Sequence, residues 1–270
     1  MIKKLIKLSL IAIVILATVH AQTISLADAE IQLQKRQVTL DGIRGMIKKT
    51  PDNNDLKIKE IDALVEVADS KRTVRQPGSG LADYQLAVAL LNAQLLKKPN
   101  DPVLLNYLGD VMVAVASIRD DTKSHSVAEA VKARQAIAEL RGKLSREFPL
   151  NLTMREKWAS SLDTLGLAKL KNSQREEAEV DMDRALELLE ANHDMSIENG
   201  QNLKKSAQMY AFAASRVMDG VSRKRATIWI NKAIAKSEVL SRKGLLISPE
   251  EKKWPKELRD MAAMVAKQKP

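Results

Sequence analysis

Four short segments carry the pattern of a helix start, in which a serine or threonine is followed three residues later by glutamate. They are Ser126 with Glu129, Thr153 with Glu156, Ser173 with Glu176, and Ser248 with Glu251. In such a capping box the hydroxyl accepts a hydrogen bond from a free backbone amide of the first turn, and the glutamate reaches back to the amide of the cap. The two-residue alternation typical of strands is nearly absent. We therefore predict an all-α chain.

Apolar residues recur with helical spacing between turn residues, which divides the chain into helices. We predict helices at 25–49, 55–74, 81–98, 102–119, 126–147, 153–171, 174–192, 198–218 and 223–242. The segment 76–80, with one proline and two glycines, is interpreted as a linker. A last helix should begin at Ser248, and Trp254 and Pro255 should kink or restart it.

The first 21 residues resemble a secretory signal peptide. Three lysines precede a nearly continuous apolar run from Leu8 to Val19, and Ala21 offers a cleavage point before Gln22. An uncleaved membrane anchor is the alternative, but the run is shorter than the roughly 20 residues that span a bilayer. We expect an exported protein, periplasmic or secreted.

Composition excludes several classes of site and partner. The sequence has no cysteine, which excludes a disulfide scaffold, a thiol nucleophile and a zinc–cysteine site. The net charge of +10 predicts weak attraction to anionic envelope surfaces or acidic proteins. Aromatic residues are only 3% of the chain and no nucleic-acid motif occurs, so we do not expect a nucleic-acid partner.

Small residues recur at a fixed interval of about 48 residues, which indicates a stack of helix pairs. The recurring positions are Ala130 and Ile137, Ala178 and Ala185, and Ala226 and Ala233. Small residues two turns apart let a neighbouring helix approach closely. The alternative is an ordinary helical bundle in which these alanines coincide by chance.

The spacing of Leu165-Gly166, Ala178 and Ala185 resembles that of the tetratricopeptide repeat family, and Pro99 precedes Gly109 as a helix-ending proline does there. The resemblance covers residues 81–242 and implies a right-handed stack of antiparallel helix pairs. The period of about 48, against about 34 in the family, indicates longer helices. The third pair departs further, because Ala213-Ala214 replaces Leu-Gly. The expected segments are thus a signal peptide (1–21), a helical hairpin with linker (22–80), repeats (81–242) and a capping helix (243–270).

In this family the first helices of the pairs line a concave face that binds peptides or partner helices. By the family's pattern, seven residues should face into it: Asn106, Asp110, Ser160, Asp163, Lys171, Gln208 and Ser215. The lysine and asparagine set with which some relatives clamp a peptide carboxylate is not present. We expect a non-enzymatic scaffold that binds a protein or peptide partner in the cell envelope.

We find no catalytic, cofactor or metal-binding motif in the sequence, and we expect no cofactor. His193 and Asp194 near a predicted helix end are interpreted as helix-end residues and not as a catalytic or metal pair. The alternative function is a helical hydrolase or lyase of the cell wall, with Glu156 or Glu176 as its acid.

Both ends of the predicted stack carry apolar surface. The first helix has Ile24, Ile31, Val38, Leu40, Ile43 and Ile47. This is more than one neighbour hides, so the helix either caps the stack or binds a partner, possibly a second copy. We favour the cap and a monomer. At the other end, the stripe of Leu258, Met261, Ala262 and Val265 predicts packing on the preceding pair.

Overall fold

The computed structural model describes residues 26–74, 77–195 and 199–267, and this part of the chain contains helices and no strand. The predicted signal peptide and Ile24 lie outside the described residues. The helices are α2 (Leu26–Lys49), α3 (Asn54–Thr73), α4 (Pro77–Leu95), α5 (Pro102–Thr122), α6 (Val127–Glu147), α7 (Leu152–Lys171), α8 (Arg175–Met195), α9 (Asn199–Ser215), α10 (Arg223–Arg242) and α11 (Trp254–Lys267), with 3-10 turns η1 (Arg216–Asp219) and η2 (Glu251–Lys253). The predicted all-α class is confirmed.

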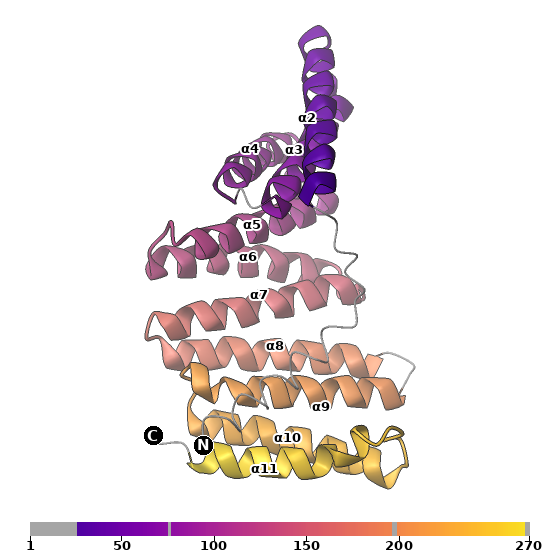
Figure 1. Cartoon of the computed structure of the whole chain (residues 1–270), viewed down its shortest axis with the longest axis vertical. Coiled ribbons are helices and arrows are strands. Elements are labelled where there is room, and N and C mark those ends of the chain that lie inside the picture. The colour runs from indigo at the N-terminus through magenta and orange to yellow at the C-terminus, as the bar shows by residue number, and fades with distance from the viewer. Residues whose placement is uncertain (1–25, 75–76, 196–198, 268–270) are drawn as a thin grey trace.

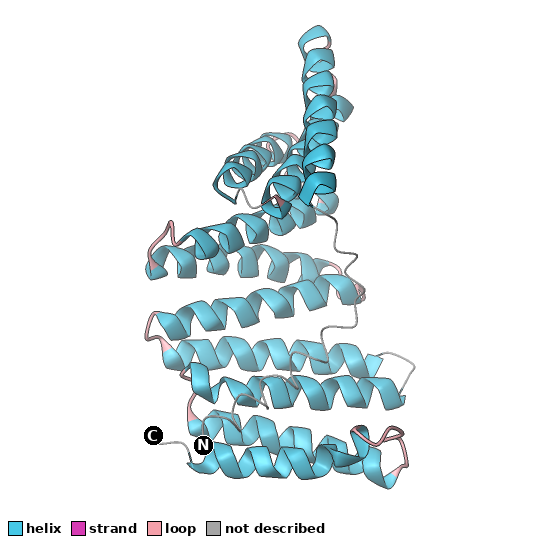
Figure 2. Ribbon diagram, in the orientation of Figure 1, coloured by secondary structure: helices cyan, strands magenta, loops and turns pink. Residues whose placement is uncertain are grey.

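The helices form a solenoid in which each one packs mainly against its neighbours in sequence. Figure 1 shows α5 to α11 stacked one above another, with short turns at alternate ends. At the N-terminal end α2 stands apart from this ladder and lies along the long axis of the molecule. Figure 2 shows that loops are confined to the ends of the helices.

Two of the four predicted capping boxes form. The Ser126 hydroxyl accepts from the Glu129 amide at 3.3 Å, and Glu129 accepts from the Ser126 amide at 2.8 Å. Ser248 and Glu251 make the same pair of bonds before η2, after which α11 restarts at Trp254 as predicted.

The other two predicted boxes are wrong. Asn151 caps α7 in place of Thr153, because its side chain accepts from the Met154 amide at 3.1 Å. Ser173 has a φ of 62°, which is a left-handed backbone conformation. A residue that caps the start of a helix needs an extended backbone, so Ser173 closes the end of α7 and does not cap α8.

The predicted linker at 76–80 is also corrected for its described residues. Pro77 is the first residue of α4, a position where the missing N–H of proline has no partner to lose. A Cβ on Gly80 would lie 3.0 Å from the Ala68 carbonyl oxygen of α3. Gly80 therefore permits a close approach between two helices.

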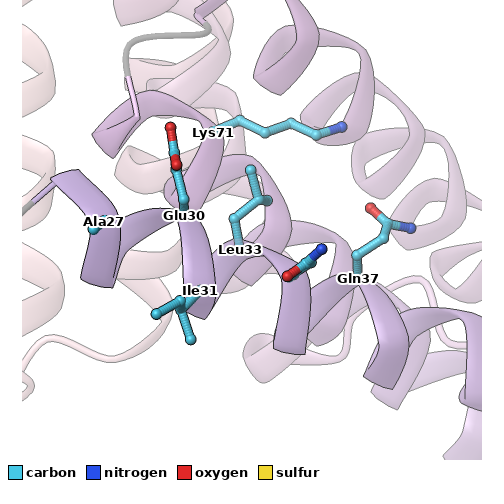
Figure 3. Close-up of a pocket in the computed structure, with 7 residues that line it drawn as sticks. Ala27, Glu30, Ile31, Leu33, Gln37 and Lys71 are labelled. Carbon is cyan, nitrogen blue, oxygen red and sulfur yellow. The ribbon is translucent and has the colours of Figure 1, made fainter.

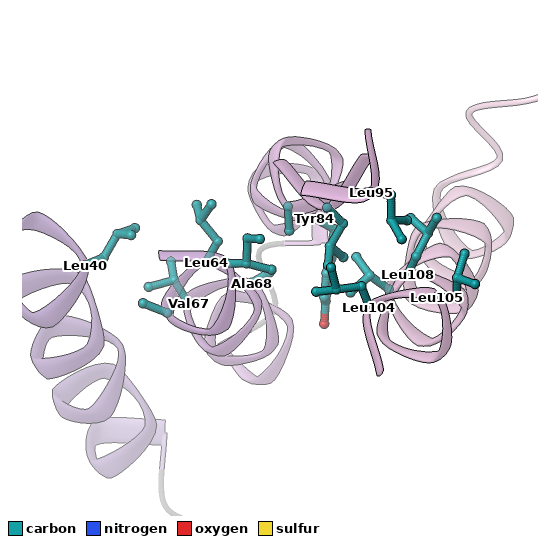
Figure 4. Packing of buried hydrophobic residues seen from close by; sticks show 14 of the residues in the cluster. Leu40, Leu64, Val67, Ala68, Tyr84, Leu95, Leu104, Leu105 and Leu108 are labelled. Carbon is teal, nitrogen blue, oxygen red and sulfur yellow. The ribbon is translucent and has the colours of Figure 1, made fainter. Parts of the chain in front are cut away.

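The core runs along the stack as a series of buried clusters. Figure 4 shows the N-terminal one, in which Leu40 of α2, Leu64 of α3, Tyr84 of α4 and Leu105 of α5 lie between successive helices. At the other end, Val265 is buried in a cluster with α9 and α10, and Leu258, Met261 and Ala262 pack against it. The predicted C-terminal stripe is confirmed.

The six recurring positions are all buried: the five alanines Ala130, Ala178, Ala185, Ala226 and Ala233, and the larger Ile137. A close contact joins α7 to α8. A Cβ on Gly166 would lie 3.0 Å from the Ala178 carbonyl oxygen and 2.7 Å from a side-chain carbon of Met182. Gly166 and Ala178 thus face each other where the two backbones approach closely.

We expect Ala178→Leu to lower the free energy of unfolding by about 1–3 kcal/mol, because the larger side chain overpacks this contact. The control is Ala191→Leu in the same helix, whose side chain is exposed and should have room. Chemical denaturation of the two variants measures the difference. Equal losses at the two positions would contradict a tight contact specific to Ala178.

Candidate partner-binding face

Polar bonds connect the first helices of successive pairs, α5, α7 and α9 with its extension η1. Asp110 of α5 accepts from Arg141 of α6 at 2.8 Å and from Lys157 of α7 at 2.6 Å. The same lysine donates to Asn106 at 3.1 Å. Burial lowers the pKa of the Arg141 guanidinium, and Asp110 acts against this shift. Two of the predicted face residues, Asn106 and Asp110, therefore lie together on a bridge between α5 and α7.

A second bridge joins α7 to the end of α9. The guanidinium of Arg216 binds both carboxylate oxygens of Asp163, one of them at 2.7 Å. Only 8% of the Arg216 side chain is exposed, against 35% for Asp163. The guanidinium also lies over the ring of Phe212, 4.9 Å from its centre. This arrangement fixes Asp163, Phe212 and Arg216 relative to one another.

The remaining predicted face residues lie on the same helices, Ser160 and Lys171 on α7 and Gln208 and Ser215 on α9. Ser160, Lys171 and Ser215 are exposed and Gln208 is half-buried, and Ser215 donates its hydroxyl to the Phe212 carbonyl at 2.6 Å. Phe212, 51% exposed, was not predicted. The sequence could have indicated Phe212, because it follows Gln208 by one helical turn and therefore lies on the same side of that predicted helix.

We define the first-helix face as the side chains that α5, α7 and α9 present around the two bridges: Asn106, Asp110, Ser160, Asp163, Lys171, Gln208, Phe212 and Ser215. Asp110 and Asp163 were predicted to face into the concave surface. In the structure both already bind cations of other helices. They therefore position this face, and the exposed groups offered for contact are Ser160, Lys171, Phe212 and Ser215.

The second helices have a similar set of bridges. Asp183 of α8 accepts from the indole nitrogen of Trp229 of α10 at 2.8 Å and also pairs with Arg225. Glu179 accepts from the Ser222 amide at 2.6 Å. Trp229 is only 1% exposed, so the carboxylate of Asp183 satisfies the polar edge of a core side chain.

The groups considered for catalysis or metal binding do not converge on a site. Glu156 and Glu176 are exposed, whereas an acid kept protonated near neutral pH needs apolar surroundings. His125 lies 2.9 Å from Asp120 in the turn after α5. The side chains of His193 and Asp194 lie outside the described part. Among the described residues no group of three or more potential metal ligands occurs.

Two hollows of the described surface lie away from the first-helix face. One of about 540 Å³ is lined by Ala27, Glu30, Ile31, Leu33, Gln34, Gln37 and Lys71, and Figure 3 shows Ile31 and Leu33 pointing to different sides of α2 there. The other is at the turn after α10, beside Leu246 and Ile247.

One described helix, α5, is long and apolar enough to cross a membrane by length and composition, and 39% of its apolar window is buried. Leu104, Leu105, Leu108, Val111 and Ile118 of this helix belong to the N-terminal core cluster. These apolar side chains of α5 thus pack against other helices of the stack.

We expect Asp163→Ala to lower the free energy of unfolding by about 1–3 kcal/mol, because Arg216 keeps a buried charge without its carboxylate. The control is Glu187→Ala, which removes a pair with Arg184 whose side chains are 53% and 59% exposed and should change stability by less than about 0.5 kcal/mol. Thermal or chemical unfolding compares them. A loss no greater for Asp163→Ala than for the control would contradict the structural role of the bridge.

Comparison with known proteins bears on the fold. No family model and no curated protein matches the chain. Among solved structures, the crystal structure of BtubC (BKLC) from P. vanneervenii is similar with a TM-score of 0.52 and 16% identity, over 90% of this chain and 94% of that one. The de novo designed helical repeat protein DHR64 aligns over 88% of this chain and 96% of its own, with a TM-score of 0.27 and 14% identity. The similarity to BtubC supports an all-α helical-repeat solenoid.

Proposed function

We propose that this protein is a non-enzymatic scaffold that binds a protein or peptide partner through the first-helix face. The observation that carries the proposal is the pair of bridges Asp110–Lys157 and Asp163–Arg216, which link α5, α7 and the end of α9 and so fix the surface that carries the exposed groups of α7 and α9. We also assign the repeats to a long-helix, degenerate form of the tetratricopeptide repeat, on the spacing of Gly166, Ala178 and Ala185.

A fixed surface of this kind favours binding because less conformational entropy is lost when the partner docks. Phe212 is an exposed aromatic ring already stacked on a buried arginine. Aromatic side chains of this kind contribute strongly to protein interfaces. Ser160 and Ser215 add hydrogen-bonding groups, and Lys171 adds a cation. This combination suits an extended peptide with an acidic residue better than it suits an apolar helix.

The face can be tested with paired variants of the purified protein. In the first, Phe212→Ala and Lys171→Glu alter the first-helix face. In the control, Val180→Ala and Lys224→Glu change an exposed aliphatic residue and an exposed lysine on the second helices. We expect recovery of envelope proteins on the immobilised chain to fall about tenfold or more in the first variant alone, as when an interface anchor is lost. Equal recovery by both variants, with unchanged melting temperatures, would remove this face from the proposal.

We also propose that the protein acts after export, in the periplasm or outside the cell, on the signal-peptide pattern of residues 1–21. Intact-mass measurement of protein purified from the producing cell tests this. We expect a mature chain that begins at Gln22 and is found in the periplasmic or secreted fraction. A chain that keeps residues 1–21 and remains in the cytoplasmic fraction would contradict export.

A further inference from the structure

Within the described residues, helix α2 has one face that packs and one that is open. Leu40 and Ile43 are buried against α3, and Arg44 pairs with Glu60 of α3 at 2.9 Å. On the opposite side of the helix, Ile31 is 49% exposed and Val38 70% exposed. Aliphatic side chains one heptad apart on an open helix face are typical of a surface that another helix covers.

Two glycines on the open side have no packing role within the described chain. A Cβ on Gly42 or on Gly45 would meet nothing within 4 Å, and neither residue has a positive φ. Glycine inside a helix is less stable than alanine by roughly 0.5–1 kcal/mol. Both glycines would be explained if the backbone of another molecule approached α2 closely at these positions.

The open face is symmetric about Val38. Seven residues form its central stripe at helical spacing: Ala27, Ile31, Gln34, Val38, Gly42, Gly45 and Lys49. In an antiparallel pair of two such helices centred on Val38, the two Val38 side chains meet at the centre, and on either side of them each larger residue meets a smaller one. Ile31 then lies opposite Gly45 of the second copy, and Gln34 lies opposite Gly42 of the second copy. The stripe is therefore sterically complementary to itself in the antiparallel direction.

The charges beside the stripe favour the same direction. Glu30 and Lys48, both exposed, lie on the same flank because they are five helical turns apart at about 3.6 residues per turn. Antiparallel pairing places Glu30 beside Lys48 of the second copy at both ends of the contact. Parallel pairing would place the Glu30 side chains of the two copies on opposite flanks of the contact and would bring neither of them beside Lys48, so this attraction would be lost.

In place of the monomer expected from the sequence, we propose that a second copy of this chain binds the open face of α2, forming an antiparallel two-fold α2–α2 contact centred on Val38. Ile31, which is among the α2 residues that line the hollow described above, contributes to this contact. Because α2 is at the N-terminal end of the described stack (Figure 1), the pairing joins two solenoids by their N-terminal ends. The first-helix face on α5, α7 and α9 stays outside the contact.

The first test uses the absence of cysteine from the chain. Val38→Cys places one thiol from each copy next to the two-fold axis, within the range where a disulfide can form. Under mild oxidation we expect this variant to form a covalent dimer. The control Val180→Cys, at a position 63% exposed on α8, should remain monomeric. Equal crosslinking of both variants, or none at Val38→Cys, would overturn the proposal.

The second test exchanges the flanking charges. Glu30→Lys and Lys48→Glu, each alone, create like-charge contacts and should raise the dimer dissociation constant about tenfold. The double exchange restores the attraction and should return the constant to within about threefold of the original. Analytical ultracentrifugation measures all four proteins. A double variant as weak as either single one would refute the antiparallel register.

The third test separates dimerisation from folding. Gly45→Leu has free space within the chain and is a better helix former, so the melting temperature at monomeric concentration should rise or stay unchanged. The same change blocks the approach of Ile31 of the second copy and should weaken dimerisation about tenfold or more. An unchanged dissociation constant, or a chain that is monomeric at every concentration before any change, would overturn the proposal.

Discussion

Each helix of this protein hides its apolar side mainly against the helix before it and the helix after it, and this restriction governs the rest of the structure. A stack built in this way has no single centre, so its stability is close to a sum of neighbouring interfaces. Polar bonds also join helices that are two places apart. Asp110 with Lys157, Asp163 with Arg216, and Asp183 with Trp229 are 47, 53 and 46 residues apart, close to the period of the small residues. The apolar contacts therefore build the ladder, and the polar bonds fix one pair of helices relative to the next.

The bridges explain how the first-helix face can be both polar and well ordered. An exposed ion pair contributes little, but Arg141 and Arg216 are largely buried and each meets an aspartate at the edge of the surface. Buried cations reduce the freedom of their carboxylate partners, and those partners lie among Ser160, Phe212 and Ser215. The proposed binding surface thus depends on residues that a partner need not touch.

Local chemistry was enough to predict the helices, and long-range contacts account for what was missed. Ser126 and Ser248 start helices as predicted, but Asn151 stands two residues before Thr153 and takes the capping role that both could fill. Gly80 suggested a linker because the sequence does not show its close neighbour. A side chain at this position would meet the carbonyl of Ala68, which lies in another helix. Asp110 and Asp163 were placed on the correct helices, yet their partners Arg141 and Arg216 are 31 and 53 residues away. No local pattern in the sequence pairs them.

The near-constant separation of the bridged residues has a consequence for how such a chain can change length. If one whole helix pair were duplicated, the new copy would bring its own aspartate and its own cation at the spacing that the neighbouring pairs already use. Duplication of a single helix would reverse the direction of the helices that follow it and would separate the partners of each bridge that spans it. The architecture therefore permits growth or loss in units of one helix pair, and the length of the protein becomes a quantity that evolution can vary in discrete steps.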